Sequence, residues 1–88
     1  MTPLVSVVIP TYNRREFLLE ALRSVFAQTF SDYEILVVDD GSTDQTEEAV
    51  KSLAKPISYV FKTHSGAASA RNCGIQGAAG RYVAFLDS

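Results

Sequence analysis

Hydrophobic residues along this 88-residue chain are concentrated in four short runs, at residues 4–9, 35–38, 57–62 and 82–86. The length of these runs and their content of β-branched and aromatic residues are typical of strands. Three segments alternate with them, at residues 15–30, 43–53 and 67–76, and the first has apolar residues at helical spacing. The pattern predicts an α/β fold in three layers, with a mostly parallel sheet, right-handed crossovers and helices on both faces.

Polar residues follow each predicted strand directly. These residues are Thr11, Tyr12 and Asn13; Asp39 and Asp40; His64 and Ser65; and Asp87 and Ser88. Parallel strands place their carboxyl ends at one edge of the sheet, where ligands of α/β proteins bind. The sequence therefore predicts one ligand site formed by residues that are far apart in the chain.

The second predicted strand ends in two adjacent carboxylates, Asp39 and Asp40, followed by Gly41. Ser42 precedes Gln45 by three residues, which is the spacing of a capping box and predicts the start of the second helix. Neighbouring like charges are costly unless they are bound or solvated. The corner is therefore either a ligand-binding pair or a solvated turn with a helix-capping aspartate.

The predicted edge combines carboxylates with the guanidinium of Arg71. Such a set suits a ligand that has hydrogen-bond donors and a phosphate, together with Mg²⁺ or Mn²⁺. A carboxylate can accept the imide N–H of uracil, whereas cytosine offers an acceptor at that position. The chain has neither a G-x-G-x-x-G motif nor a P-loop motif, so a Rossmann dinucleotide site and a P-loop are not expected.

Composition narrows the class of protein. The chain is 47% hydrophobic and 20% charged, as expected for one small globular domain. Its net charge of -2 gives no support for nucleic-acid binding. No apolar run is long enough to predict a membrane span. With Cys73 as the single cysteine, no internal disulfide is possible, and a reducing, cytoplasmic location is expected.

Two polar residues of the predicted edge have ordinary alternatives. His64 is the only histidine, and a histidine in a loop is more often solvated than catalytic. Arg71 could form a surface ion pair that contributes little to stability.

Several ordered motifs closely resemble the family 2 glycosyltransferases of the GT-A fold. They lie at residues 5–13, 24–30, 34–44, 70–74 and 80–87, with Gly66 between them. The resemblance implies the nucleotide-binding half of GT-A, with strand order 3-2-1-4. It also implies transfer of a sugar from a nucleotide diphosphate sugar, with UDP as the expected nucleotide and Mg²⁺ or Mn²⁺ as the cofactor. Cell-wall or polysaccharide biosynthesis, and a place for the longer protein at the inner face of the membrane, follow from the same likeness.

The resemblance also assigns roles to individual residues. Pro10, Thr11 and Tyr12, with Asn13 beside them, would line the base and ribose pocket. Asp40, or its neighbour Asp39, would accept the uracil imide proton. Arg71 would lie near the diphosphate. Asp87 resembles the first residue of the acidic D-x-D motif, which holds ribose and metal.

The chain departs from the family pattern at its end. The second aspartate of D-x-D and the acceptor-binding half, where the family keeps its catalytic base, are absent from these 88 residues. Residues 1–88 are therefore expected to be the donor-binding half of a truncated domain, inactive by itself and without a catalytic residue. The alternative is a non-catalytic nucleotide-binding or assembly module derived from this fold. A nucleotidyltransferase fits less well, because the first strand is not followed by a glycine-rich basic loop.

The last predicted strand, residues 82–86, lies at an outer edge in the strand order 3-2-1-4. It contains no lysine, proline or charge. Edges of this kind pair with other chains. The sequence therefore predicts a dimer or a larger species formed through this strand.

Overall fold

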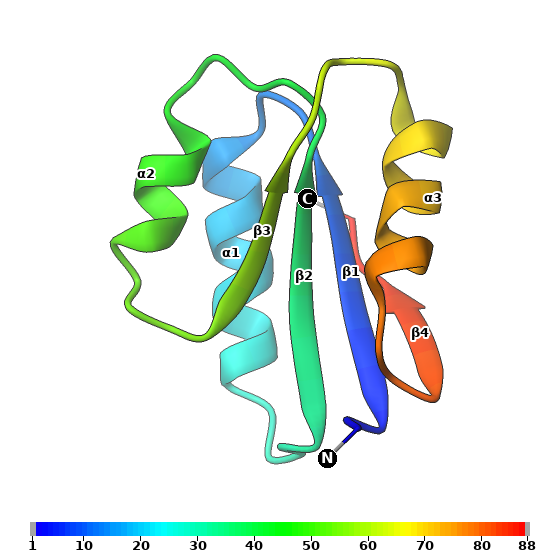
Figure 1. Cartoon of the computed structure of the whole chain (residues 1–88). Coiled ribbons are helices and arrows are strands. Elements are labelled where there is room, and N and C mark those ends of the chain that lie inside the picture. The colour runs from blue at the N-terminus through cyan, green and yellow to red at the C-terminus, as the bar shows by residue number, and fades with distance from the viewer. Residues whose placement is uncertain (1, 88) are drawn as a thin grey trace.

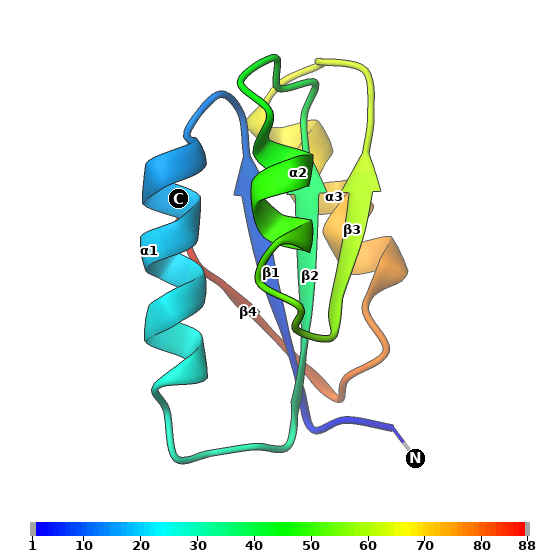
Figure 2. The same ribbon diagram turned by 90° about the vertical axis from the view of Figure 1, so that its left-hand side faces the viewer.

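The computed structural model describes residues 2–87 and contains three layers, with a four-stranded sheet between helices (Figure 1). The strands are β1 (Val5–Thr11), β2 (Tyr33–Asp39), β3 (Ile57–Phe61) and β4 (Tyr82–Phe85). The helices are α1 (Arg15–Phe26), α2 (Thr46–Lys51) and α3 (Ala67–Gly77). Helices α1 and α2 cover one face of the sheet and α3 covers the other, as the two views together show (Figures 1 and 2).

The strand order is β3-β2-β1-β4, and every pair of neighbouring strands is parallel. The predicted order is therefore confirmed, and the sheet of the described residues is entirely parallel. Strand β1 runs beside β2 along its whole length, from Val5 opposite Tyr33 to Thr11 opposite Asp39. This register brings the carboxyl ends of the two central strands to the same level.

Successive residues of β1 and β2 point to opposite faces of the sheet and are buried on both. Ile9 and Val37 belong to the cluster that packs under α1 and α2. Val8 and Val38 belong to the cluster that packs under α3. This alternation is the normal consequence of the pleat. It explains why the central strands read as continuous apolar runs.

Helix α3 lies unusually close to the sheet. A Cβ atom added to Gly74 would lie 2.3 Å from Cγ1 of Val8. The sheet is therefore the close neighbour of this helix at Gly74, and any larger side chain there would collide with Val8.

The predicted helix boundaries were wrong at three places, one of which is the end of α2, at Lys51 rather than near residue 53. Helix α1 ends at Phe26 rather than near residue 30. Helix α2 begins at Thr46 rather than near residue 43, and the capping box from Ser42 to Gln45 does not form, because Gln45 has a left-handed φ of 62° and no side chain caps the helix. The Ser42 hydroxyl instead accepts a hydrogen bond from the backbone N–H of Asn13, at 2.8 Å.

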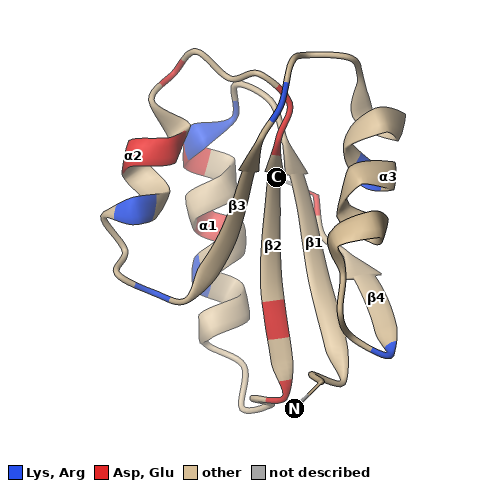
Figure 3. Ribbon diagram, in the orientation of Figure 1, with Lys and Arg blue, Asp and Glu red and all other residues tan. Residues whose placement is uncertain are grey.

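A polar network ties β4 to the amino-terminal end of the sheet. The Ser6 hydroxyl donates to the Glu34 carboxylate, which also accepts the N–H of Ala79 at 2.7 Å, and the Gly80 N–H donates to Ser6 at 2.8 Å. The Ser6 hydroxyl, followed by the Ala79 N–H, lowers the pKa of Glu34 against the opposing effect of burial. Charged positions are otherwise absent from the middle of the described strands (Figure 3).

Two surface properties complete the fold. All four residues of β4 are exposed, with Tyr82 at 59% and Phe85 at 45%. Within residues 2–87, no helix has the length and apolar character needed to cross a membrane. The cytoplasmic location stays a prediction.

Candidate functional site

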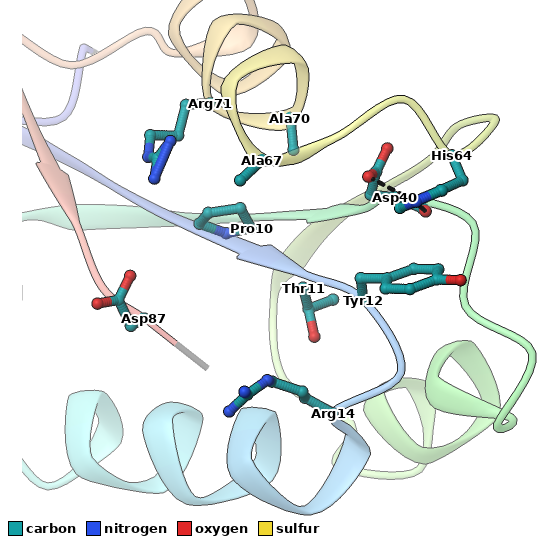
Figure 4. A pocket seen from close by; sticks show the side chains of 10 residues that line it. All are labelled: Pro10, Thr11, Tyr12, Arg14, Asp40, His64, Ala67, Ala70, Arg71 and Asp87. Atoms are coloured by element: carbon teal, nitrogen blue, oxygen red, sulfur yellow. Dashed lines mark hydrogen bonds and ion pairs between the residues drawn. The ribbon is translucent and has the colours of Figure 1, made fainter.

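A cavity of about 460 Å³ opens at the carboxyl edge of the sheet, between β1, the end of β2 and helix α3 (Figure 4). Its lining residues are Pro10, Thr11, Tyr12, Arg14, Asp40, His64, Ala67, Ala70, Arg71 and Asp87. This volume lies within the range of small-molecule sites. Six of the eight residues predicted for the site line this cavity; the exceptions are Asp39 and Asn13.

Asp39 lies on the opposite side of the sheet from the cavity. One carboxylate oxygen accepts the Ser42 N–H at 2.8 Å, and the other accepts the Tyr59 hydroxyl. Burial, together with this hydrogen bond to Asp39, raises the pKa of Tyr59 well above its ordinary value. The sequence left open which of the two aspartates faces the ligand, and the structure brings only Asp40 to the cavity.

Asn13 connects two loops instead of lining the cavity. Its φ of 50° is left-handed, which asparagine tolerates better than most residues. Its side-chain oxygen accepts the Thr43 N–H at 2.8 Å, and its own N–H donates to Ser42. The structure therefore gives Asn13 a role in holding the β1–α1 turn against the β2–α2 loop.

Asp40 is the most strongly hydrogen-bonded group of the cavity. One oxygen accepts the Lys62 ammonium at 3.1 Å and the Ser65 N–H at 3.0 Å; the other accepts the Gly66 N–H at 2.9 Å and faces His64 Nδ1 at 2.9 Å. Burial acts to raise the pKa of Asp40, but the N–H groups of Ser65 and Gly66 and the Lys62 ammonium hold it below its ordinary value. The carboxylate is therefore a fixed negative charge at one end of the cavity.

The Thr11 hydroxyl is buried and lacks a hydrogen-bond partner among residues 2–87. Thr11 is only 3% exposed and lines the cavity next to Pro10. A buried hydroxyl without a partner costs free energy, so nearly all such groups in proteins are hydrogen-bonded. A polar ligand in this cavity could supply the missing bond.

Tyr12 and His64 form an aromatic pair beside Asp40. Their ring centroids lie 4.0 Å apart and their planes are inclined by 20°. Figure 4 shows the pair at the same end of the cavity as Asp40. His64 is not among the residues predicted for the site, because a histidine in a loop is more often solvated than functional. The signal that could have placed it there was its position directly after the third strand.

Charged side chains occupy the other end of the cavity. Arg71 projects from α3 and Asp87 follows β4, and both are exposed (Figure 4). Neither forms an ion pair with another described residue. Arg14, which sequence reasoning missed, also lines the cavity, on the other side of β1 from Arg71, and its guanidinium lies 5.3 Å from the centre of the Phe17 ring (Figure 4). A guanidinium group such as that of Arg71 suits a phosphate group.

Asp87 alone does not make a metal site. Within residues 2–87, no group of three or more histidine, cysteine, aspartate or glutamate side chains is placed to hold a metal ion. Mg²⁺ and Mn²⁺ can bind through one or two carboxylates together with substrate phosphates. Asp87 fits the role of one such carboxylate.

Comparison with known proteins shows a clear similarity. The family model described as glycosyl transferase family 2 matches residues 6–88. A glycosyltransferase of Rickettsia conorii is 50% identical over 86 residues, which cover 96% of this chain and 14% of that protein. The Bacillus subtilis glycosyltransferase TuaG, whose name refers to teichuronic acid biosynthesis, is 44% identical over 98% of this chain and 36% of its own length. The chain thus spans a minor part of these relatives.

Solved structures show the same fold. Residues 1–349 of Staphylococcus aureus TarS in complex with UDP-GlcNAc align with a TM-score of 0.85 and 36% identity, over 96% of this chain and 26% of that one. The mannosyltransferase PcManGT of Pyrobaculum calidifontis, in complex with GDP-Man and Mn²⁺, aligns with a TM-score of 0.82 and 30% identity. That alignment covers 99% of this chain and 28% of PcManGT.

Proposed function

Since this chain belongs to glycosyl transferase family 2 and shares the GT-A fold of its solved relatives, we propose that it is the donor-binding part of a glycosyltransferase. In this proposal residues 1–88 are the nucleotide-sugar-binding half of the domain. The longer protein would transfer the sugar to an acceptor hydroxyl during polysaccharide or cell-wall synthesis. The observation that carries the proposal is the cavity itself, which joins the fixed carboxylate of Asp40 to the guanidinium of Arg71.

The two ends of the cavity suit the two ends of a nucleoside diphosphate. The base would lie at the Asp40 end, beside the Tyr12 ring, where a carboxylate can accept an imide N–H. The ribose would lie along Pro10 and Thr11, and one of its hydroxyls could bond the orphaned Thr11 hydroxyl. The diphosphate would then reach Arg71.

The negative charge of Asp40 limits which nucleobases can bind at this end of the cavity. Uracil and guanine carry a ring N–H that can donate to a carboxylate, whereas cytosine carries an acceptor at the matching ring position. The solved relatives include one with UDP-GlcNAc and one with GDP-Man. We place UDP first, as the family resemblance implies, and expect CDP to bind much more weakly.

A divalent metal would act at the phosphate end. PcManGT is solved with Mn²⁺, and divalent ions are used within this family. In this chain Asp87 would supply one carboxylate ligand, and phosphate oxygens would supply others. The metal would neutralise the charge of the leaving nucleotide when bound. We therefore expect weak metal binding by these 88 residues when nucleotide is absent, which calorimetry would measure.

The proposal is tested by titrating the chain with UDP, CDP and uridine while recording amide NMR spectra. We expect UDP to shift signals around Tyr12, Asp40 and Arg71, with CDP binding at least tenfold more weakly because Asp40 cannot donate to cytosine. Equal shifts from UDP and CDP, or shifts far from the cavity, would contradict the proposal.

The variant Arg71→Gln tests the phosphate end of the cavity independently of the base end. This change should weaken UDP binding by about five- to tenfold, since a hydrogen bond from a charged donor to phosphate is lost. Uridine has no phosphate, so its affinity should stay the same. Arg23→Gln removes the same charge from α1, away from the cavity, and serves as the matched control.

We also propose that β4 mediates association of two copies of this chain. Its exposed edge carries Tyr82, Val83 and Phe85 and has no charged residue to discourage pairing. A second copy could add its own β4 beside this edge and continue the sheet.

Sedimentation equilibrium of the wild type and of Val83→Lys tests this association. The wild type should form a dimer or larger species, and a charge on β4 should shift it toward monomer. Ser58→Lys places the same charge on β3, at the opposite edge of the sheet, and should leave the dimer intact. A monomeric wild type at high concentration would refute the proposal, and a dimer insensitive to Val83→Lys would move the interface elsewhere.

A further inference from the structure

The Asp40 carboxylate already has a donor at each of its acceptor positions. Lys62 and the Ser65 N–H bond one oxygen, while the Gly66 N–H and His64 Nδ1 lie 2.9 Å from the other. A carboxylate offers about four lone-pair positions. A base that is to donate its ring N–H to Asp40 must therefore displace one of these donors.

The backbone donors cannot leave without unfolding the loop. Ser65 and Gly66 donate from the main chain that leads into α3. This loop also packs tightly on Gly41, because a Cβ atom added there would lie 2.9 Å from the His64 backbone nitrogen. Gly41 has a φ of 89°, which favours glycine at this position. The backbone around Asp40 is therefore closely fixed.

Lys62 is also firmly held. Its ammonium donates to the Thr63 carbonyl at 3.0 Å and to the Ser65 hydroxyl, in addition to Asp40. Its side chain is 20% exposed, compared with 53% for that of His64. Displacing Lys62 would break three hydrogen bonds and leave the buried carboxylate without its cation, which is costly.

The imidazole of His64 is the donor that can leave by side-chain rotation alone. Its Nδ1 faces the Asp40 carboxylate at 2.9 Å and the Asp40 carbonyl at 3.1 Å. Because both are acceptors, Nδ1 carries a proton. Besides facing Asp40, the imidazole stacks on the ring of Tyr12.

The same imidazole covers the Tyr12 ring. With the centroids 4.0 Å apart, the two rings are in contact and leave no space for a third ring between them. A base can stack on this face of Tyr12 only where the imidazole now lies. One side chain thus occupies both positions that a base would need, the acceptor on Asp40 and the face of Tyr12.

We infer that His64 competes with the nucleobase and determines nucleotide affinity by occupying the base position. This inference rests on the proposed binding of a nucleoside diphosphate in the cavity. A site that is open in only a fraction of molecules has its affinity reduced by that fraction. Removal of the imidazole therefore strengthens nucleotide binding, whereas removal of a ligand-contacting residue would weaken it.

Calorimetry of the 88-residue chain with UDP and uridine tests the inference. His64→Ala should bind both ligands about three- to tenfold more tightly than the wild type does. His64→Phe keeps a ring on Tyr12 but cannot bond Asp40, so its affinity should lie at or below that of His64→Ala. Asn72→Ala, on an exposed part of α3 outside the cavity, is the matched control and should bind like the wild type.

NMR of the wild type gives a readout that needs no variant. Addition of UDP should shift the ring protons of His64, because they leave the ring-current field of Tyr12. Two results would overturn the inference and leave the proposed function intact. One is that the wild type binds UDP while the ring signals of His64 stay unchanged. The other is that the wild type binds UDP and His64→Ala binds it no more tightly. Absence of nucleotide binding in both wild type and His64→Ala would overturn the proposed function and this inference together.

Discussion

Asp39 and Asp40 are adjacent in sequence, yet their side chains lie on opposite faces of the sheet and have different surroundings. Asp39 points toward α2, where it holds the Tyr59 hydroxyl and the Ser42 N–H. Asp40 points toward α3, where it lines the cavity beside Tyr12 and His64. Both side chains are buried, at 1% and 3% residue exposure. Residue type and burial therefore do not distinguish an aspartate that is enclosed by neighbouring elements from one that lines the cavity.

The difference comes from the pleat of β2. Val37 belongs to the α1 and α2 side and Val38 to the α3 side, and the next two residues continue this alternation. A carboxylate becomes available to a ligand on the face where the neighbouring elements leave a cavity. On the other face, α2 and the loop that precedes it cover the carboxylate. We therefore expect substitutions of Asp39 and of Asp40 to differ in their effects on UDP binding.

Asp40→Asn should have the largest effect. The asparagine amide cannot accept hydrogen bonds from all the groups that now donate to the Asp40 carboxylate. It also leaves the Lys62 ammonium without its anion. We expect the free energy of unfolding to fall by about 2–3 kcal/mol and UDP binding to weaken by at least tenfold. Chemical denaturation and calorimetry would measure the two losses. Unchanged UDP affinity in a folded variant would place the base elsewhere.

Asp39→Asn should reduce stability by about 1 kcal/mol, because its bonds to Tyr59 and Ser42 are weakened rather than lost. UDP affinity should stay within about twofold of the wild type, because Asp39 does not line the cavity. Tyr59→Phe removes the partner hydroxyl. The double variant should lose less free energy of unfolding than the sum of the losses in the two single variants. A tenfold loss of UDP binding in Asp39→Asn would erase the distinction between the two faces.

Acid should reveal the contribution of Asp40 through its lowered pKa. A carboxylate whose folded pKa lies below the ordinary 3.8 contributes its full stabilisation above the unfolded pKa and loses it as pH falls through the folded pKa. The stability gap between wild type and Asp40→Asn should therefore be constant above about pH 5 and should narrow below about pH 4. Denaturation curves over this range would test it, and a gap that widens in acid would contradict the sign.

Glu34→Gln should have the smallest effect and serves as the control from the opposite end of the sheet. It weakens the bonds to Ser6 and Ala79, and we expect a loss of about 0.5–1 kcal/mol. UDP binding should be unchanged, because Glu34 lies at the amino-terminal ends of the strands. Loosening of β4, measured by faster amide exchange at residues 82–85, is the expected local signature.

The sequence alone determined the layers, the parallel sheet and the edge of the sheet at which the cavity lies. Four apolar runs separated by helical segments leave few other arrangements, because each crossover between parallel strands is right-handed. Polar residues after each run then meet at one edge, which is how Tyr12, Asp40 and Asp87 could be predicted together. The ordered motifs added the family and the strand order.

The tertiary structure decided what each polar side chain faces. Which of the two aspartates opens to the cavity depends on the register of β2 and on what packs over each face, and no local pattern contains that information. Asn13 and Ser42 were free to bond each other across two loops, and that contact replaced the capping box expected from spacing. His64 entered the site because Gly41 lets its backbone approach, a contact between residues distant in sequence that only the packed chain creates.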